Sequence, residues 1–260
     1  NGISFTGSYD TGTQVYQQAI KNWCRVQLEM GGKNALVILN DARLDLAVDL
    51  AVKGGFGLTG QACTATSRLI VEAGIADSFA AALSDAARRL VVGDGLDAHT
   101  QMGPLVNQDQ VATVQKYVSL GKKEGAQLIA GGTVDDQKGY YAQPTIFDHV
   151  EPTMQIAQEE IFGPVLGIIR AQDLEDAIEK ADQISFGLSA GVVTNDLQKA
   201  FTFANRVEAG IVKINEPTTG LALNAPFGGF KHSSANTFKE QGPAAVEFYT
   251  RTKTIYVGHG

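Results

Sequence analysis

Strand-like and helix-like segments alternate along most of this 260-residue chain, and this pattern restricts its fold more than any other feature. Runs of aliphatic and β-branched residues at 35–39 and 165–169 predict buried strands, whereas residues 76–90 carry apolar side chains at helical spacing. Alternating strands and helices are typical of layered α/β folds. We therefore predict a mostly parallel sheet with flanking helices.

The remaining segments extend this order. We expect further strands at residues 3–5, 25–28, 68–72, 127–130, 190–194 and 210–215, and further helices at residues 9–22, 111–124, 174–182 and 197–207. From residue 221 to residue 241 the pattern breaks into Gly, Ser and Asn, which predicts an irregular loop region. Alternating β-forming residues at 248–257 predict a closing strand.

Composition and charge argue against several functional classes. A net charge of −7 at pH 7 offers no basic face for nucleic acid. No apolar stretch approaches the ~20 residues of a membrane helix. Two cysteines, Cys24 and Cys63, are too few for a secreted disulfide framework, so we expect a reducing, cytoplasmic location. We predict no metal site.

The chain opens on Asn1, without an initiator Met, in what we interpret as an interior strand. A native N-terminus seldom begins in the middle of a strand. We therefore expect the chain to be a fragment of a longer protein.

Cys63 stands in the pentapeptide Gly60-Gln61-Ala62-Cys63-Thr64, where we expect a loop to enter a helix. A helix N-terminus lowers the pKa of a thiol and so favours the reactive thiolate. The alternative is a small buried apolar residue, which is what free cysteines usually are. The pentapeptide alone leaves both interpretations open.

Two acidic residues are similarly ambiguous. Glu29 precedes Gly31 and Gly32, which let the backbone approach closely and leave the carboxylate accessible, but a solvated turn residue has the same pattern. Glu160 directly precedes an apolar turn that contains Phe162. Its alternative is an acid at a helix end beside a core Phe.

Two glycine-containing turns are also candidates for binding. Thr6-Gly7-Ser8 lies between a predicted strand and a predicted helix, where free N–H groups and the helix dipole attract phosphate. The segment lacks the G-x-G-x-x-G fingerprint of dinucleotide-binding turns. Phe227, followed by Gly228 and Gly229, indicates by itself only a turn.

In their order and spacing these motifs resemble the aldehyde dehydrogenase superfamily, over essentially the whole chain. Glu29 lies 34 residues before Cys63, and Glu160 lies 97 residues after it, as in that family. The motifs are Phe5-Thr6-Gly7-Ser8, Leu28-Glu29-Met30-Gly31-Gly32-Lys33, Gly60-Gln61-Ala62-Cys63, Met102-Gly103-Pro104-Leu105, Glu160-Ile161-Phe162-Gly163-Pro164 and Pro226-Phe227-Gly228-Gly229.

The resemblance implies an NAD(P)-dependent oxidation of an aldehyde to a carboxylic acid. Cys63 would attack the aldehyde to form a thiohemiacetal, and Glu29 would activate the water that hydrolyses the later thioester. The aldehyde would lie against Ala62, Thr64 and Phe227, and Glu160 would hold the nicotinamide ribose. The residues expected to bind the cofactor are Thr6, Gly7, Ser8, Met30, Gly31, Glu160 and Phe162.

The resemblance also implies a domain organisation. Residues 1–28 would end a cofactor-binding domain, residues 29–232 would form the catalytic domain, and residues 233–260 would form a bridging segment with an oligomerisation strand. Most of the NAD or NADP site would precede Asn1, so we expect the isolated chain to be inactive. The full-length enzyme would be a homodimer or a homotetramer.

The main departure from the family pattern lies at residues 231–242, where the Gly and Arg of the Lys-x-Ser-Gly-x-Gly-Arg-Glu motif are replaced. The segment is most similar to that of α-ketoglutarate semialdehyde dehydrogenases, which also have a stretch like Pro217-Thr218-Thr219-Gly220. This similarity points to an acidic semialdehyde as the substrate.

Two other functional classes stay open. A cysteine esterase would use Cys63 and Glu29 without a cofactor, and its ester turnover would be unaffected by NAD(P)⁺. In a catalytically silent binding homologue, Cys63, Glu29 and Glu160 could each be replaced without loss of function, so the presence of all three argues against this class.

Overall fold

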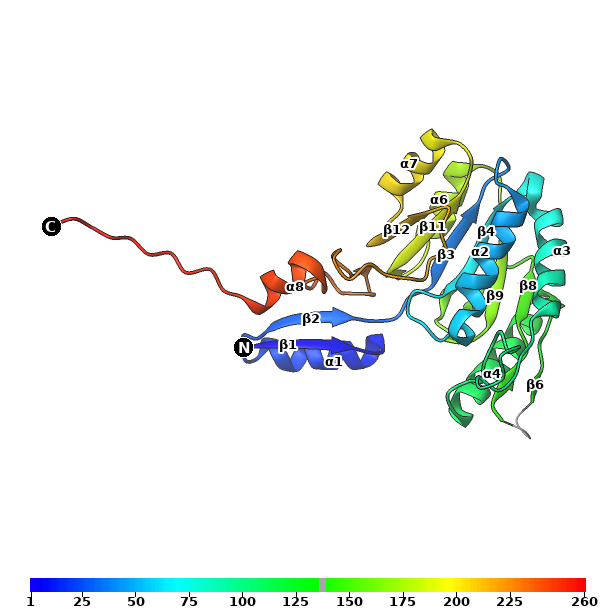
Figure 1. Ribbon diagram of the computed structural model, residues 1–260, viewed down its shortest axis with the longest axis horizontal. Helices are drawn as coiled ribbons and strands as arrows, with labels where there is room; N and C mark the ends of the chain where they lie inside the picture. Colours follow the sequence, from blue (N-terminus) through cyan, green and yellow to red (C-terminus); the bar gives the residue numbers. More distant parts are fainter. Residues whose placement is uncertain (136–138) are drawn as a thin grey trace.

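The computed structural model describes residues 1–135 and 139–260 and shows a large layered α/β unit beside a smaller strand–helix–strand unit (Figure 1). At the centre of the large unit is a seven-stranded sheet with the order β12-β11-β3-β4-β9-β8-β5. All neighbouring strands are parallel except β5 and β8, which are antiparallel. The predicted, mostly parallel sheet is therefore confirmed.

The strands of this sheet are short, and the inner ones are mostly buried, whereas the edge strands β12 and β5 are partly exposed. Along β3 and the residue that follows it, Ala35, Val37 and Leu39 pack into one apolar cluster, whereas Leu36 and Ile38 pack into another on the opposite face. Alternate side chains point to opposite faces of a strand, so a strand covered on both sides is apolar throughout. The strands are β3 (Asn34–Ile38), β4 (Thr66–Glu72), β5 (Gln127–Ala130), β8 (Thr145–Asp148), β9 (Val165–Ala171), β11 (Ser189–Val193) and β12 (Ile211–Ile214).

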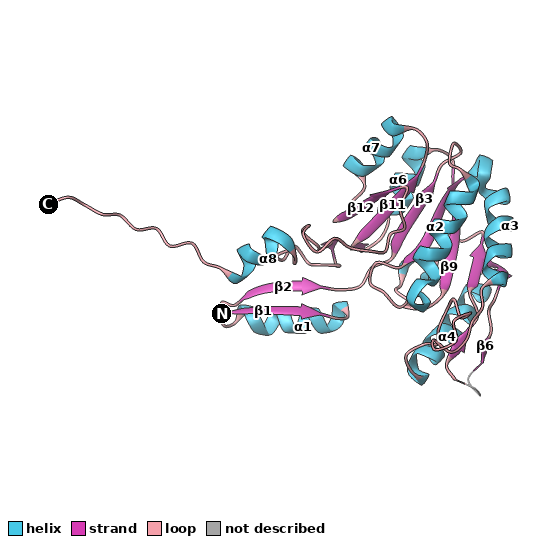
Figure 2. Cartoon of the chain, viewed as in Figure 1, coloured by secondary structure: helices cyan, strands magenta, loops and turns pink. Residues whose placement is uncertain are grey.

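Helices cover both faces of the sheet (Figure 2). One face packs against α2 (Leu44–Phe56) and α3 (Ala73–Arg89). The other packs against α4 (Gln108–Glu124), α6 (Leu174–Asp182) and α7 (Leu197–Arg206). The last three begin after side chains that accept backbone N–H groups of the first turn, which is how Asn and Asp stabilise helix starts; these residues are Asn107, Asp173 and Asp196.

The smaller unit consists of β1 (Gly2–Thr6), α1 (Tyr9–Ile20) and β2 (Arg25–Glu29), with β1 and β2 parallel. A small core forms between α1 and β2; its buried members are Ala19, Val26, Leu28 and Met30. The remaining short elements are the 3-10 helix η1 (Gly57–Gly60), β6 (Val134–Asp135), β7 (Tyr141–Ala142), α5 (Gln155–Gln158), β10 (Phe186–Gly187), β13 (Phe230–Lys231) and α8 (Gly242–Tyr249).

After β13 the chain returns along the smaller unit. The backbone N–H of Met30 donates to Ser233 O at 2.8 Å, and the N–H of Leu28 donates to Thr237 Oγ1 at 2.8 Å. No helix in the described part of the chain combines the length and the apolarity needed to span a bilayer.

The predicted strand at 248–257 is wrong. Helix α8 runs to Tyr249, and residues 251–260 have no regular secondary structure. The Arg25 guanidinium donates to the carbonyl oxygens of Glu247, Phe248 and Thr250, at 2.7 to 3.0 Å, and so satisfies acceptors that a helix end leaves free. No described strand lies beside residues 251–260 to pair with them.

Strand β8 was absent from the sequence predictions, although it lies within the central sheet between β9 and β5. It has four residues, all buried, and such a short apolar run has no clear periodicity.

We expect Phe147→Ala to destabilise the fold by about 3–5 kcal/mol, because Phe147 is completely buried in β8 and its truncation leaves a cavity. The exposed Phe201 is the matched control, and Phe201→Ala should cost about 0.5 kcal/mol or less. Urea unfolding followed by circular dichroism measures both. Equal losses in the two variants would contradict the packing described above.

Candidate active site

Ten of the residues singled out in the sequence line one cavity of about 490 Å³ between the two units. They come from the turn after β1, the end of β2, the turn before β4, the loop before β9 and the C-terminal loop region. The ten residues are Thr6, Gly7, Ser8, Glu29, Met30, Gly31, Cys63, Glu160, Phe162 and Phe227. The fold therefore brings together segments that are far apart in the sequence.

Cys63 lies in a turn between η1 and β4, so the predicted helix around it is wrong. Leu58 and Thr59 within η1 have left-handed backbone angles, with φ of 51° and 59°, which break helical continuity before the cysteine. The Thr59 hydroxyl donates to Gly103 O at 3.1 Å, and the side chain of Gln61 accepts from the N–H of Val106 at 2.9 Å. The motif at residues 102–105 and the residue after it therefore anchor the turn that carries Cys63.

Burial raises the pKa of the half-buried Cys63 thiol, and the negative charges of Glu160 and Glu29 raise it further. A hydrogen bond from the Thr64 N–H opposes this shift. The expectation that a helix N-terminus lowers this pKa is therefore wrong, because there is no helix start at Cys63 and two carboxyl groups are near it.

Glu29 ends β2 and is only 4% exposed, so the sequence expectation of an accessible carboxylate is wrong. Ser234 Oγ donates to its Oε1 at 3.4 Å, and Oε2 has no hydrogen-bond partner among the described residues. Burial and the charge of Glu240 raise the pKa of Glu29 to about 8, against lowering effects of Ser234 and Lys239. A carboxyl group with this pKa can exchange protons near neutral pH.

The backbone position that faces Glu29 has no room for a side chain. Gly228 has φ of +152°, and a Cβ there would lie 2.7 Å from Glu29 Oε1. The Phe227 backbone next to it is fixed by two hydrogen bonds with Glu240, of 2.6 and 2.8 Å. The Pro226-Phe227-Gly228-Gly229 motif thus packs against the Glu29 carboxyl group.

Glu160 lies against the Gly31-Gly32 pair. Its Oε1 accepts from the Gly32 N–H at 2.9 Å, and a Cβ at Gly31 would lie 2.0 Å from Oε2. Burial raises the pKa of Glu160, whereas the Gly32 hydrogen bond and the charge of Lys33 lower it. The two glycines therefore make room for this carboxyl group and bind one of its oxygens.

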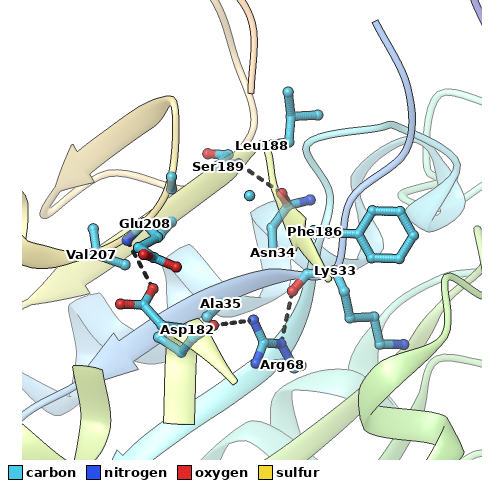
Figure 3. Close-up of a pocket in the computed structure, with 14 residues that line it drawn as sticks. Lys33, Asn34, Ala35, Arg68, Asp182, Phe186, Leu188, Ser189, Val207 and Glu208 are labelled. Atoms are coloured by element: carbon cyan, nitrogen blue, oxygen red, sulfur yellow. Dashed lines mark hydrogen bonds between the residues drawn. The ribbon is translucent and has the colours of Figure 1, made fainter. Parts of the chain in front are cut away.

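Lys33 is buried, and its Nζ has no hydrogen-bond partner among the described residues. Burial, followed by the charge of Arg68, lowers the pKa of Lys33 to about 7, although Glu160 opposes this. The Arg68 guanidinium donates to Lys33 O at 2.8 Å and fixes the backbone there (Figure 3).

The Thr6-Gly7-Ser8 turn leads into α1, as the sequence predicts. Ser8 caps the helix by accepting from the Thr11 N–H at 3.3 Å, and the Gly7 N–H donates to Glu29 O at 3.0 Å. The N-terminus of α1 therefore borders the same cavity as Cys63 and Glu160.

Ala62 and Thr64 are not in the lining of this cavity, although the sequence predicts them there. Ala62 borders a separate small pocket, and Thr64 is buried. Side chains next to each other in a tight turn point in different directions, so only Cys63 faces the cavity.

Four further lining residues were missed by the sequence reasoning: Gln110, Leu221, Glu240 and Gln241. Gln110 lies in the first turn of α4, and its side chain donates to the carbonyl oxygens of Ile161 and Phe162, at 2.8 and 3.0 Å. The other three come from the irregular loop region and from the segment that departs from the family motif. The acidic residue Glu240 is the one sequence feature that could have identified this segment as part of the site.

The alternative interpretations of the acids and of Phe162 do not fit the structure. Phe162 is 41% exposed, so it is not a core Phe, and Glu29 is not a solvated turn residue.

We expect Glu160→Gln to increase the rate at which iodoacetamide alkylates Cys63 near neutral pH, because removing a negative charge lowers the pKa of the thiol. Cys24 is the internal reference, and peptide mass spectrometry separates the two sites. Glu159→Gln is the matched control, because the exposed Glu159 does not contribute to the shift. An equal effect of both substitutions would contradict this electrostatic explanation.

A model of the aldehyde dehydrogenase family matches residues 1–255 of the chain. The 2,5-dioxopentanoate dehydrogenase of Saccharolobus solfataricus is 47% identical, over 98% of this chain and 54% of its own length. The alpha-ketoglutarate semialdehyde dehydrogenase of Haloferax volcanii is 46% identical, over 98% of this chain and 53% of its own length. The chain thus spans about half the length of these curated relatives.

Solved structures are also similar to the model. The crystal structure of betaine aldehyde dehydrogenase from Staphylococcus aureus in complex with NAD⁺ matches 95% of this chain and 50% of its own chain, with a TM-score of 0.92 and 36% identity. The match in sequence and fold extends over nearly the whole chain, and on this evidence the chain belongs to the aldehyde dehydrogenase family.

Proposed function

We propose that this chain supplies the catalytic half of an NAD(P)-dependent aldehyde dehydrogenase that oxidises an acidic semialdehyde. The observation that carries the proposal is the meeting of Cys63, Glu29 and Glu160 in one cavity. The substrate class rests on the names of the two relatives described above and on the similar segment at residues 231–242. The full-length enzyme is proposed to be a homodimer or a homotetramer.

The proposed domain organisation keeps the boundaries expected from the sequence. Residues 1–28 close the cofactor-binding domain, residues 29–232 form the catalytic domain, and residues 233–260 bridge back and join other subunits. The return of the chain along β2 supports the bridging role of the last part.

The residues around the cavity fit a nicotinamide dinucleotide. The α1 N-terminus at Ser8 offers N–H groups and a positive dipole end to a phosphate. Glu160 Oε1 is held by Gly32, so Oε2 is available to accept a ribose hydroxyl. Phe162, exposed beside this carboxyl group, would pack on the nicotinamide ring. When bound, the nicotinamide accepts the hydride that turns the thiohemiacetal into a thioester.

Cys63 begins the reaction by losing its proton. Burial raises the pKa of the thiol, so the reactive thiolate is a minor fraction at neutral pH and increases as the pH rises. The thiolate then attacks the aldehyde carbon and forms a C–S bond. The backbone N–H of Cys63 would stabilise the negative oxygen of this adduct.

Glu29 acts when the thioester is hydrolysed. Its carboxylate takes a proton from a water molecule, the water oxygen attacks the thioester carbon, and the C–S bond breaks to release the acid and the thiolate. A thiolate suits both steps, because it is a good nucleophile and a good leaving group.

We expect Cys63→Ala to abolish aldehyde-dependent NAD(P)H formation in the full-length enzyme, because no covalent adduct can form. Cys24→Ala is the control and should retain activity, since Cys24 does not line the cavity. Stopped-flow absorbance at the start of the reaction measures NAD(P)H. A burst of NAD(P)H that survives in Cys63→Ala would refute the mechanism, and ester turnover unaffected by NAD(P)⁺ would favour an esterase.

We expect Glu29→Gln to allow one burst of NAD(P)H and then to slow turnover by about 10²- to 10⁴-fold, because thioester hydrolysis loses its base. The exposed Glu151 provides the control, Glu151→Gln, which should behave as the parent. Loss of the burst together with turnover would contradict a role limited to hydrolysis.

The pH dependence of this step follows from the pKa of Glu29. Below pH 8 the carboxyl group is mostly protonated, so the hydrolysis rate should rise with pH and level off above about pH 8. Glu240→Gln should move the rise to lower pH by removing a repulsive charge, whereas Ser234→Ala should move it to higher pH. Shifts in the same direction would contradict this assignment.

A further inference from the structure

Two buried side chains that do not line the cavity hold the backbone of the Cys63 turn. Asn34 is the first residue of β3, and Thr218 lies in the loop after β12. They are 3% and 0% exposed. Their polar atoms are therefore shielded from water and have to find partners within the protein.

Asn34 bridges the turn to two strands. Its Nδ2 donates to Cys63 O at 2.8 Å and to Ala65 O at 2.9 Å. Its Oδ1 accepts from the Ser189 N–H at 3.0 Å (Figure 3). An asparagine amide has two N–H donors, so both are used. The β3–β4 register shifts between Asn34 and Ala35, so this side chain acts where the ladder is irregular.

Thr218 binds the carbonyl group of Thr64, which lies between the two carbonyl groups that Asn34 binds. Its hydroxyl donates to Thr64 O at 2.7 Å and also lies 2.7 Å from Thr66 Oγ1. A hydroxyl carries a single proton, so Thr66 has to be the donor to Thr218. The backbone of Thr218 is fixed in turn, because its carbonyl accepts from Ser189 Oγ at 2.9 Å.

Three successive carbonyl groups, at residues 63, 64 and 65, thus accept hydrogen bonds from buried side chains of other segments. This matters because the Cys63 turn follows left-handed residues and belongs to neither a helix nor a strand. Regular hydrogen bonding does not fix the direction of its side chains. The bonds from Asn34 and Thr218 supply that constraint.

We propose that Asn34 and Thr218 are positioning residues for the nucleophile, and that they aim Cys63 Sγ into the cavity by clamping the turn from outside it. This inference rests on the proposed function of Cys63. It also assigns a role to Thr218 of the Pro217-Thr218-Thr219-Gly220 stretch, whose similarity to other sequences points only to the substrate class. Neither residue touches the substrate, so their effect is expected on kcat and not on KM.

The test uses Thr218→Val, which keeps the shape of the side chain and removes the hydroxyl. A looser turn exposes the thiol and lessens its desolvation, so alkylation of Cys63 relative to Cys24 at pH 7 should rise about threefold to tenfold. In the full-length enzyme kcat should fall on the order of tenfold, with KM within about twofold of the parent value.

The matched control is Thr145→Val. Thr145 is 1% exposed, and its hydroxyl also donates to a backbone carbonyl, Gln143 O at 2.8 Å, but it lies in β8 and its hydroxyl does not bind the Cys63 turn. Its variant should lose stability without a change in the alkylation ratio. The conservative Thr218→Ser keeps the hydroxyl and should restore the parent ratio and kcat.

A second pair of variants covers the case in which Thr218→Val does not fold. Asn34→Ala should raise the alkylation ratio in the same way. Asn215→Ala should leave it unchanged, although the Asn215 amide also bridges backbone groups, the N–H and carbonyl of Thr194.

The inference is overturned if the alkylation ratio does not rise in the folded variants of Thr218 and Asn34, or if it rises equally in their controls. Alkylation requires neither aldehyde nor cofactor. A parent enzyme without aldehyde-dependent NAD(P)H formation would therefore refute the proposed function, while the alkylation ratio would still decide whether these residues position Cys63.

Discussion

The site depends on the close contact between Glu160 and the buried segment that joins β2 to β3. Gly31 leaves the space that the carboxyl group occupies, and Gly32 donates to it, so a side chain at Gly31 would collide with Glu160. Glu29 directly precedes this segment and lines the cavity. Asn34 directly follows the segment and holds the Cys63 turn by a hydrogen bond. One contact thus connects the smaller unit, the central sheet and the candidate nucleophile.

Burial sets the protonation states in this region. The thiol of Cys63 and the carboxyl group of Glu29 both have raised pKa values, because each would have to carry a negative charge away from water and near other acids. Both groups are therefore mostly protonated at neutral pH, and each reacts only in the fraction that has lost its proton. Lys33, whose pKa is lowered to about 7, gives Glu160 a positive neighbour only when it holds its proton.

Some local structure could not have been predicted from the chain alone. Left-handed angles at Leu58 and Thr59 are unusual for such residues and prevent a helix before Cys63 that their propensities would allow. The β-forming residues at 248–257 do not form a strand, because a strand needs a neighbour and the Arg25 guanidinium instead satisfies the end of α8. The short strand β8 carries too few residues for a readable period.

The alternation of strands and helices and the spacing of Glu29, Cys63 and Glu160 can be read from the chain, because periodicity and order are properties of the sequence. The sequence thereby identified most of the residues that line the cavity. The raised pKa of Cys63, the effect of the Glu240 charge on Glu29, and the bonds from Asn34 and Thr218 to the turn become visible in the folded chain alone. Desolvation, charge proximity and long-range hydrogen bonds depend on which groups surround a residue in space, and those groups come from distant parts of the sequence.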